Sequence, residues 1–302
     1  MATPGVIFDA SDISVTSTLL VATNRKPVGG ARKPWFGPGR GSGTTFARAK
    51  LTPPDGGRFS LSAVGLSDWR IDEVEQMAQF GDLFPPERSG RDLFMYVPGF
   101  NQTFEMVALD AARLSNAVKF HGSTMVFSWP SKANLLDYGY DRESAMWSRD
   151  ALERVLEKVI ANSDIGRTHI VAHSIGTMLT LEALRELYAL QPTASVERIG
   201  SVVFAAPDID IDVFSSSVAR IGPLASKITV ITSTNDRALA ISALIAGGIT
   251  RVGSAEKARL ESLGLRVIDA SQEGWGIINH DLFLSNAQIQ EVIRNAIDGM
   301  GA

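Results

Sequence analysis

The sequence predicts an α/β fold in which a mostly parallel central sheet carries helices on both faces. Two observations predict it. From residue 91 onward, short apolar runs typical of strands alternate with longer segments typical of helices. The strand runs are almost continuously apolar, as expected for parallel strands that are buried on both faces. Because such sheets bind ligands at the carboxyl ends of their strands, the functional residues are expected at that edge.

Six apolar runs are predicted to be strands: 93–97, 124–129, 169–173, 201–206, 228–233 and 265–270. Helices are predicted between them over 103–120, 143–163 and 177–190. In the first of these helices, apolar residues such as Met106, Leu109 and Val118 recur at helical spacing. The order of strand and helix is therefore that of a sheet built from parallel crossover units.

Residues 1–90 contain fewer periodic apolar segments, so we expect an extension packed on a main domain of residues 91–302. Within that extension Gly and Pro predict a loop, and alternating residues predict strands joined by a PPDGG turn. The predicted pieces are a strand at 18–23, a loop at 28–43, strands at 44–51 and 58–64, and a short helix at 67–80.

Composition excludes several classes of protein. The chain has 302 residues, 29 basic and 33 acidic, so it lacks the basic excess that binds nucleic acid. It has no cysteine, which excludes disulfides, a thiolate nucleophile and Cys-ligated metals. No apolar run is long enough for a transmembrane helix. The opening residues do not form a signal peptide, and both a bacterial cytoplasmic location and export after removal of a leader stay open.

One strand-to-helix junction carries a candidate nucleophile. The predicted strand HIVAH runs directly into Ser174, with Ala172 two residues before it and Gly176 two residues after. This is the G-x-S-x-G pattern of the nucleophile elbow in the α/β-hydrolase fold, with Ala in the first small position. Small residues are expected there because the turn is sharp. The Ile175 N–H would then face a developing oxyanion. The alternative is that Ser174 is an ordinary helix N-cap.

A serine hydroxyl needs a general base, and chain order favours His280 among the four histidines. His169 and His173 flank the strand that leads to the serine, and His121 precedes a strand at the opposite edge of the sheet. Only His280 follows the last predicted strand, in the loop GWGIINHDLF. The acid lies between serine and histidine in this chain order, which leaves two candidates.

Asp236 directly follows the strand at 228–233, and Asp208 follows the strand at 201–206. Asp236 is preferred because it occupies the usual place of the acid in the strand order, and Asp208 is kept as the alternative. Each could instead cap a helix or a turn. The acid would hold the imidazole tautomer and stabilise the imidazolium ion.

The loop after the strand at 93–97 is the expected source of a second oxyanion donor. Gly99 would let the backbone approach the substrate, and the Phe100 N–H is the candidate donor, although a plain turn is the competing interpretation. Candidate pocket residues nearby are Gly99, Asn101, Trp129, Tyr138 and His173. For each aromatic residue, packing in the core is the competing role.

We expect neither a cofactor nor a metal. The chain has no His-x-x-x-His pair and no acidic cluster at metal-ligand spacing. The glycine-rich GPGRGSGTT lacks the Lys-Ser/Thr pair of a phosphate-binding loop, and no strong strand precedes it.

Several strings together resemble one bacterial family, the α/β-hydrolases of unknown function called DUF900. They are LLVATNRKP with a later FGPGRGS, VPGFNQTFE, FSWPS followed by YGYDRESAMWS, HIVAHSIGT, FAAPDID and STNDRALAIS. The similarity extends from about residue 18 to about residue 285. It implies a serine hydrolase with an esterase-like or lipase-like site, and it assigns Ser174, Asp236 and His280 as the triad. Members are often exported or lipid-anchored.

The chain departs from the family at two places. Pro98-Gly99-Phe100-Asn101 stands where the family commonly has His-Gly-Tyr-Asn, which changes the wall beside the oxyanion loop but keeps the backbone donors. The final histidine is followed by Asp281 and Leu282 rather than Ser-Tyr, and a carboxylate beside the base would alter its pKa.

The residues favour cleavage of a small-molecule or lipid ester, with short or medium acyl chains, through an acyl-enzyme. The same triad would also serve an acyltransferase or a thioesterase. A non-catalytic binding protein of the same fold is the alternative from another class, and a broken triad would be its signature.

Overall fold

The computed structural model describes residues 17–29, 33–53, 69–84, 90–233, 239, 242, 250–255, 257–272 and 282–299. The strands within these ranges are β1 (Thr18–Pro27), β2 (Phe36–Thr52), β3 (Arg70–Met77), β4 (Arg91–Val97), β5 (Ser123–Ser128), β6 (Ile165–His173), β7 (Ile199–Ala205), β8 (Ile228–Thr232) and β9 (Arg266–Asp269). All of them belong to one sheet, in the order β3-β2-β1-β5-β4-β6-β7-β8-β9.

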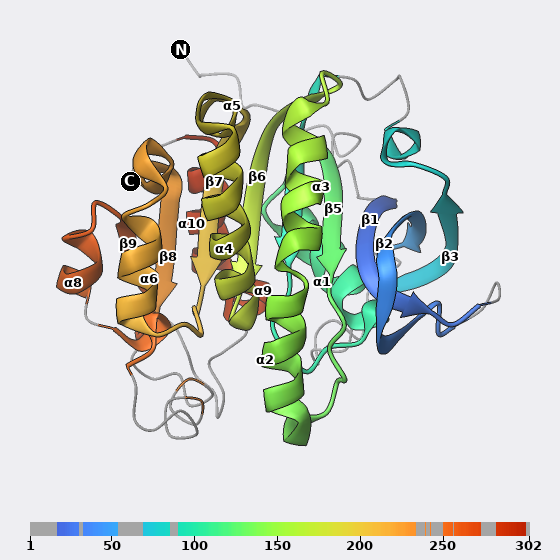
Figure 1. Ribbon diagram of the computed structural model, residues 1–302, viewed down its shortest axis with the longest axis horizontal. Helices are drawn as coiled ribbons and strands as arrows, with labels where there is room; N and C mark the ends of the chain where they lie inside the picture. Colours follow the sequence, from blue (N-terminus) through green and yellow to red (C-terminus); the bar gives the residue numbers. More distant parts are fainter. Residues whose placement is uncertain are drawn as a thin grey trace, which may run out of the picture.

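The central part of this sheet is parallel. Strands β1, β5, β4, β6, β7, β8 and β9 pair in parallel, and only β2 and β3 pair antiparallel at one edge. In this order β5 comes before β4, so β4 lies between β5 and β6. β6, the strand that leads to Ser174, is therefore a direct neighbour of β4. The strands of the parallel part end together at the lower edge of the sheet in Figure 1.

The helices are α1 (Phe104–Ala117), α2 (Tyr138–Trp147), α3 (Arg149–Ala161), α4 (Ile175–Leu190), α5 (Pro192–Arg198), α6 (Ile211–Val218), α8 (Lys257–Glu261), α9 (Leu282–Ser285) and α10 (Ala287–Ile297). Short 3₁₀ turns lie at Phe80–Leu83, Leu135–Asp137, Gly222–Lys227 and Val252–Ser254. Helices α2, α3, α4 and α6 cover one face of the sheet, and α1, α9 and α10 cover the other (Figure 1).

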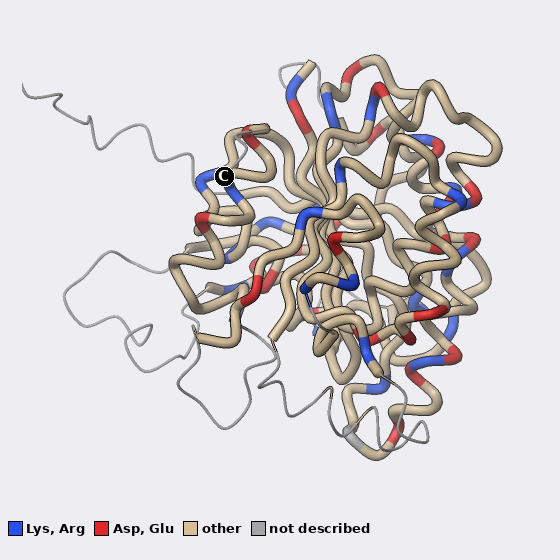
Figure 2. Tube along the Cα trace, turned by 90° about the vertical axis from the view of Figure 1, so that its left-hand side faces the viewer, with Lys and Arg blue, Asp and Glu red and all other residues tan. Residues whose placement is uncertain are grey.

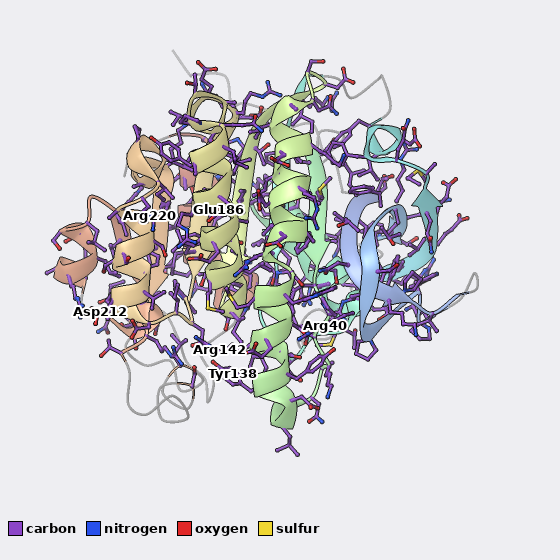
Figure 3. All side chains as sticks on the ribbon, in the orientation of Figure 1. Arg40, Tyr138, Arg142, Glu186, Asp212 and Arg220 are labelled. Carbon is purple, nitrogen blue, oxygen red and sulfur yellow. The ribbon has the colours of Figure 1, made fainter. Side chains whose placement is uncertain are left out.

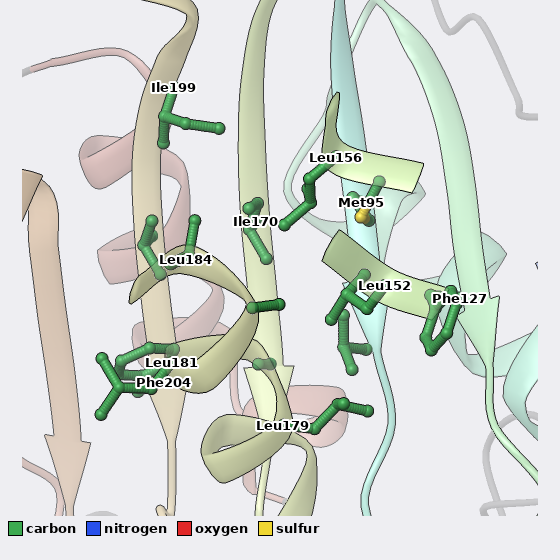
Figure 4. Packing of buried hydrophobic residues seen from close by; sticks show 14 of the residues in the cluster. Met95, Phe127, Leu152, Leu156, Ile170, Leu179, Leu181, Leu184, Ile199 and Phe204 are labelled. Atoms are coloured by element: carbon green, nitrogen blue, oxygen red, sulfur yellow. The ribbon is translucent and has the colours of Figure 1, made fainter. Parts of the chain in front are cut away.

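Alternate residues of the strands supply two apolar cores, one on each face. In β4, for example, Met95 belongs to the core under α3 and α4, whereas Phe94 and Tyr96 belong to the core under α1 and α10. Leu181 of α4 packs near Phe204 of β7 in the first core (Figure 4). Burial of both faces explains the nearly continuous apolar strands of the sequence. The predicted fold class, an α/β-hydrolase fold with a mostly parallel sheet, is confirmed.

Two predictions for the N-terminal part are wrong. The Gly/Pro-rich segment 28–43 was expected to be a loop, but β2 begins within it at Phe36 and pairs with β1. Its glycines permit this pairing: a Cβ on Gly41 would lie 2.9 Å from the Arg25 carbonyl oxygen. The segment 67–80 was expected to contain a helix, but Arg70–Met77 forms β3. Pairing with β2 outweighs the helix propensity of its Glu, Gln and Met residues.

The N-terminal strands extend the same sheet. β1 lies parallel to β5, with Thr23 beside Ser128, and the rings of Trp35 and Phe36 pack edge-on against Phe104 of α1. The strand predicted at 58–64 lies outside the described residues. The helix predicted over 143–163 is two helices, α2 and α3, which meet at Ser148. Acidic and basic residues are interspersed along the chain (Figure 2).

Candidate active site

Ser174 occupies a strained turn between β6 and α4. Its φ is 52° and its ψ is −124°, a backbone conformation that side chains other than glycine rarely adopt. The backbone is held there from both sides, because Ser174 N donates to the Ala205 carbonyl at 3.0 Å and Ser174 O accepts from Asp208 N at 3.2 Å. Strain of this kind persists only where the surrounding structure imposes it, and it clusters at functional sites.

The small residues around Ser174 are required by the end of β4. A Cβ on Gly176 would lie 2.3 Å from the Pro98 carbonyl oxygen, and one on Gly99 would lie 3.0 Å from the Ser174 Cβ. A small residue was expected at position 176 because the turn is sharp. The structure gives Gly176 a further reason, which is that α4 begins directly against the backbone of Val97 and Pro98. The loop after β4 thus lies beside the serine.

The loop of residues 98–102 and the start of α4 each present one N–H group of interest near Ser174. The Pro98 carbonyl accepts from the Trp129 indole at 2.9 Å, and Asn101 N donates to Asp141 at 3.1 Å. Among the described residues, the Phe100 N–H makes no hydrogen bond. The Ile175 N–H is at the first position of α4 and has no partner within the helix. Trp129 itself is fully buried, so it supports the loop rather than lining an open surface.

Asp208, the alternative acid, lies within a buried polar cluster. Its carboxylate accepts from the Tyr138 hydroxyl and the Ser242 hydroxyl, each at 2.7 Å, and pairs with Arg251 Nε at 3.1 Å. Burial raises the pKa of the Tyr138 phenol, and the negative charge of Asp208 adds to that increase. The Tyr138 ring also packs edge-on against Phe100, with 5.4 Å between ring centroids. Tyr138 lies at the lower end of α2 in Figure 3, on the side where the strands end.

His173 lies on the other side of the loop. Its ring packs against Phe283 of α9 at 4.6 Å between centroids, and its Nδ1 lies 2.9 Å from a Cβ placed on Gly99. The structure therefore brings Ser174, Ile175, Gly99, Phe100 and His173 together. Asp236 and His280, the predicted acid and base, lie outside the described residues.

Sequence reasoning missed two charged residues, Arg25 and Asp141. Arg25 at the end of β1 is 2% exposed, and Asp141 of α2 is 0% exposed. Burial lowers the pKa of the Arg25 guanidinium to about 10, and the nearby negative charge of Asp141 opposes that shift. Arg25 therefore stays protonated at neutral pH. No short motif marks either residue in the sequence, because they reach the same loops only in the folded chain.

Within the described part of the chain, no helix is long and apolar enough to cross a membrane. No group of three or more His, Asp or Glu residues there could hold a metal ion.

Comparison with known proteins gives matches of low similarity among solved structures. They include a predicted CIB-like hydrolase from Thermoplasma acidophilum (15% identity, TM-score 0.40, covering 85% of this chain and 92% of that one). The carboxylesterase CesB from Bacillus subtilis matches at 10% identity and TM-score 0.43, over 86% and 89% of the two chains. An esterase from Pyrobaculum calidifontis matches at 11% identity and TM-score 0.45, over 96% and 85%. At these identities and TM-scores, the matches assign no function to this chain.

An uncharacterized protein of Nostoc sp. is 33% identical over 86 residues, which is 28% of this chain. The match spans only 21% of that protein's length. A family model described as "Alpha/beta hydrolase of unknown function (DUF900)" matches residues 75–296, which is most of the chain and includes both β4 and the Ser174 turn. The chain therefore belongs to the DUF900 family of α/β-hydrolases.

Proposed function

We propose that this protein hydrolyses carboxylic esters through an acyl-enzyme on Ser174. The observation that carries the proposal is the backbone of Ser174, held at a φ of 52° where β6 meets α4. This conformation is costly, and an ordinary helix N-cap has a negative φ in the extended region. It is the conformation expected of a nucleophile elbow, which raises the serine hydroxyl above the carboxyl edge of the sheet.

The proposed reaction has two halves. The Ser174 hydroxyl attacks the ester carbonyl while His280 takes its proton, and the alcohol leaves with that proton as the acyl-enzyme forms. Water then attacks the acyl-enzyme, His280 takes a proton from it, and Ser174 leaves with that proton as the acid is released. The N–H groups of Phe100 and Ile175 would stabilise the oxyanion of both tetrahedral intermediates. Asp236 would orient the imidazole.

Described residues next to His280 and Asp236 support these roles. Phe283 is three residues after His280, and its ring packs against His173, the neighbour of Ser174. Ser233 is three residues before Asp236 and lies just past the carboxyl end of β8. Three residues span at most about 11 Å, so both connections are compatible with the proposed roles.

The contacts of Asp208 favour Asp236 as the acid. Tyr138 and Ser242 already donate hydrogen bonds to the two oxygens of the Asp208 carboxylate, and the Arg251 guanidinium pairs with its charge. The acid of a triad must accept a hydrogen bond from the imidazole and stabilise the imidazolium ion, so it needs a carboxylate oxygen that is free to accept. We therefore assign Asp208 to the packing of Tyr138, whose ring supports Phe100.

A chain-length series of p-nitrophenyl esters, from acetate to dodecanoate, tests the proposal. We expect hydrolysis of the short and medium esters, and we expect Ser174→Ala and His280→Ala to abolish it. Asp236→Asn should lower kcat far more than Asp208→Asn. Ser201→Ala is the matched control, because Ser201 lies 2.9 Å from a nitrogen of His169 but within β7, away from the Ser174 turn. Absence of hydrolysis across the series would contradict the proposal.

A further inference from the structure

The Arg25 guanidinium is buried between two loops at the carboxyl edge of the sheet. Its Nε donates to the Ser128 hydroxyl at 2.8 Å, its Nη1 to the Ser131 carbonyl at 3.0 Å and its Nη2 to the Gln102 carbonyl at 2.7 Å. Arg25 belongs to β1, whereas Gln102 belongs to the loop after β4 and Ser131 to the loop after β5. One side chain from the N-terminal strand therefore joins both loops.

Asp141 of α2 complements this arrangement with the opposite charge. Its carboxylate accepts from Asn101 N at 3.1 Å, from Lys132 N at 2.8 Å and from the Ser131 hydroxyl. Asn101 has a φ of 62°, so its backbone also needs support in this conformation. Asp141 thus binds the same two loops as Arg25, at adjacent residues.

Ser131 links the two charges. Its hydroxyl donates to Asp141 and accepts from Gln102 N at 3.1 Å, while its carbonyl accepts from Arg25. The two residues that follow Phe100 in the chain, Asn101 and Gln102, are therefore fixed by three hydrogen bonds from this network. Phe100 itself keeps its N–H unused within the described part of the chain.

We infer that Arg25 and Asp141 are positioning residues for the oxyanion hole, holding the Phe100 N–H where the developing negative charge appears. The inference rests on the proposed ester hydrolysis. Burying two full charges costs several kcal/mol per ion, and apolar residues could fill the same space without that cost. Arginine suits this position because its planar guanidinium has several N–H donors in fixed directions, and three acceptors surround it here. A lysine ammonium is a compact charge and could not reach all three with the same geometry.

Three variants test the inference by steady-state kinetics on the best p-nitrophenyl ester: Arg25→Lys, Asp141→Asn and Ser131→Ala. Displacing a reacting geometry by about 1 Å costs on the order of 10²-fold in rate. We expect kcat to fall by about that factor in Arg25→Lys and by about tenfold in Ser131→Ala, with KM unchanged in both. The affinity for a trifluoromethyl ketone, which forms a tetrahedral oxyanion on the serine, should fall in parallel with kcat.

Arg198→Lys is the matched control. Arg198 also binds two carbonyls with its guanidinium, those of Asn162 and Ile165, but at the amino end of β6. It should change thermal stability without changing kcat. If Arg25→Lys does not fold, Ser131→Ala decides the question, because it removes a single hydroxyl.

The outcomes separate the two proposals. An active wild type whose kcat and ketone affinity are unchanged in Ser131→Ala and Asp141→Asn would overturn the positioning role and leave the ester hydrolase proposal standing. A wild type without ester hydrolysis would overturn the proposed function, and the positioning role would fall with it.

Discussion

At the scale of single residues, the strained backbone of Ser174 links local structure to chemistry. A residue other than glycine held in a sparsely populated backbone region costs about 1–3 kcal/mol. Ser174 is held there because its N–H donates to the Ala205 carbonyl and its carbonyl accepts from the Asp208 N–H. Ser174 thereby stands at the amino end of α4, where the helix dipole would stabilise a negative charge that developed in the proposed reaction.

Replacing Ser174 with glycine should therefore relieve strain that alanine retains. We expect the unfolding free energy of Ser174→Gly to be about 1 kcal/mol higher than that of Ser174→Ala. This difference already includes the greater entropy that glycine gives to the unfolded chain, which favours unfolding. Urea unfolding of the two variants measures the difference. Equal stabilities would show that the turn is not strained. Both variants should lack esterase activity.

Gly176 should tolerate no side chain. A Cβ there would lie 2.3 Å from the Pro98 carbonyl oxygen and 2.8 Å from the Val97 carbonyl oxygen. Gly176→Ala should destabilise the protein by about 1–3 kcal/mol, as overpacking does, and should lower kcat by moving the oxyanion loop. Gly139→Ala in α2 is the control, because no heavy atom lies within 4 Å of a Cβ at that position. A Gly176→Ala variant with wild-type stability would contradict the close approach of Gly176 to the Pro98 carbonyl.

The candidate site residues that the sequence alone could propose are those with local patterns. Ser174 and Gly176 belong to one short motif, and Gly99 follows a strand at a position that the fold prescribes. Arg25, Ser131 and Asp141 have no such pattern, because they meet only through the parallel pairing of β1 with β5. Their role depends on which strands are neighbours, which a reading of local motifs does not supply.

At the scale of elements, β6 carries a polar contact within its length as well as Ser174 after its carboxyl end. Its middle residue, His169, lies 2.9 Å from the Ser201 hydroxyl and 3.4 Å from Asp92. Burial lowers the pKa of the His169 imidazole, and its contact with Asp92 opposes that shift only in part. His169 is therefore neutral in the folded protein at neutral pH.

This shift predicts a loss of stability in mild acid. The unfolded chain takes up the proton at the ordinary histidine pKa of about 6.5, whereas the folded protein resists it until lower pH. The contribution of His169 is thus fully present above about pH 6.5 and is lost as the pH falls through its lowered folded value. Urea unfolding at a series of pH values should show a shallower decrease for His169→Gln than for wild type. Parallel curves would contradict the assignment.

The strands that sequence predicted best are those buried on both faces. β7 is apolar over nearly its whole length and β4 over its last five residues, and this signal does not depend on their neighbours. β3 was missed because only one of its residues, Ile71, is fully buried, and its other residues favour a helix. Its hydrogen bonds to β2 decide its conformation. The intrinsic preferences of its own residues do not reveal that pairing, so the sequence alone could not predict it.

At the scale of the whole molecule, one sheet runs without interruption from β3 to β9. The end of β1 supplies Arg25 to the loops of the site, and Trp35 and Phe36 pack on α1. The proposed boundary near residue 90 would therefore mark a change in sequence character rather than a separately folding unit. Through Arg25, β1 is hydrogen-bonded to the two loops that lie beside the proposed nucleophile.

We expect the N-terminal strands and the rest of the sheet to unfold together. Circular dichroism and tryptophan fluorescence should give coincident urea transitions. Hydrogen exchange under increasing denaturant should give β1 the same opening free energy as β6. Two separate transitions, with β1 and β2 opening first, would show instead that residues 1–90 fold as an independent extension.

Intact-mass analysis after exposure to a fluorophosphonate tests the nucleophile most directly. Wild type should gain one phosphonyl adduct, and Ser174→Ala should gain none. Ser201→Ala should label like wild type, because Ser201 lies within β7 and beside His169, away from the Ser174 turn at the carboxyl edge of the sheet. An adduct that persists in Ser174→Ala, or its absence from a folded wild type, would contradict the assignment of Ser174 as an activated serine.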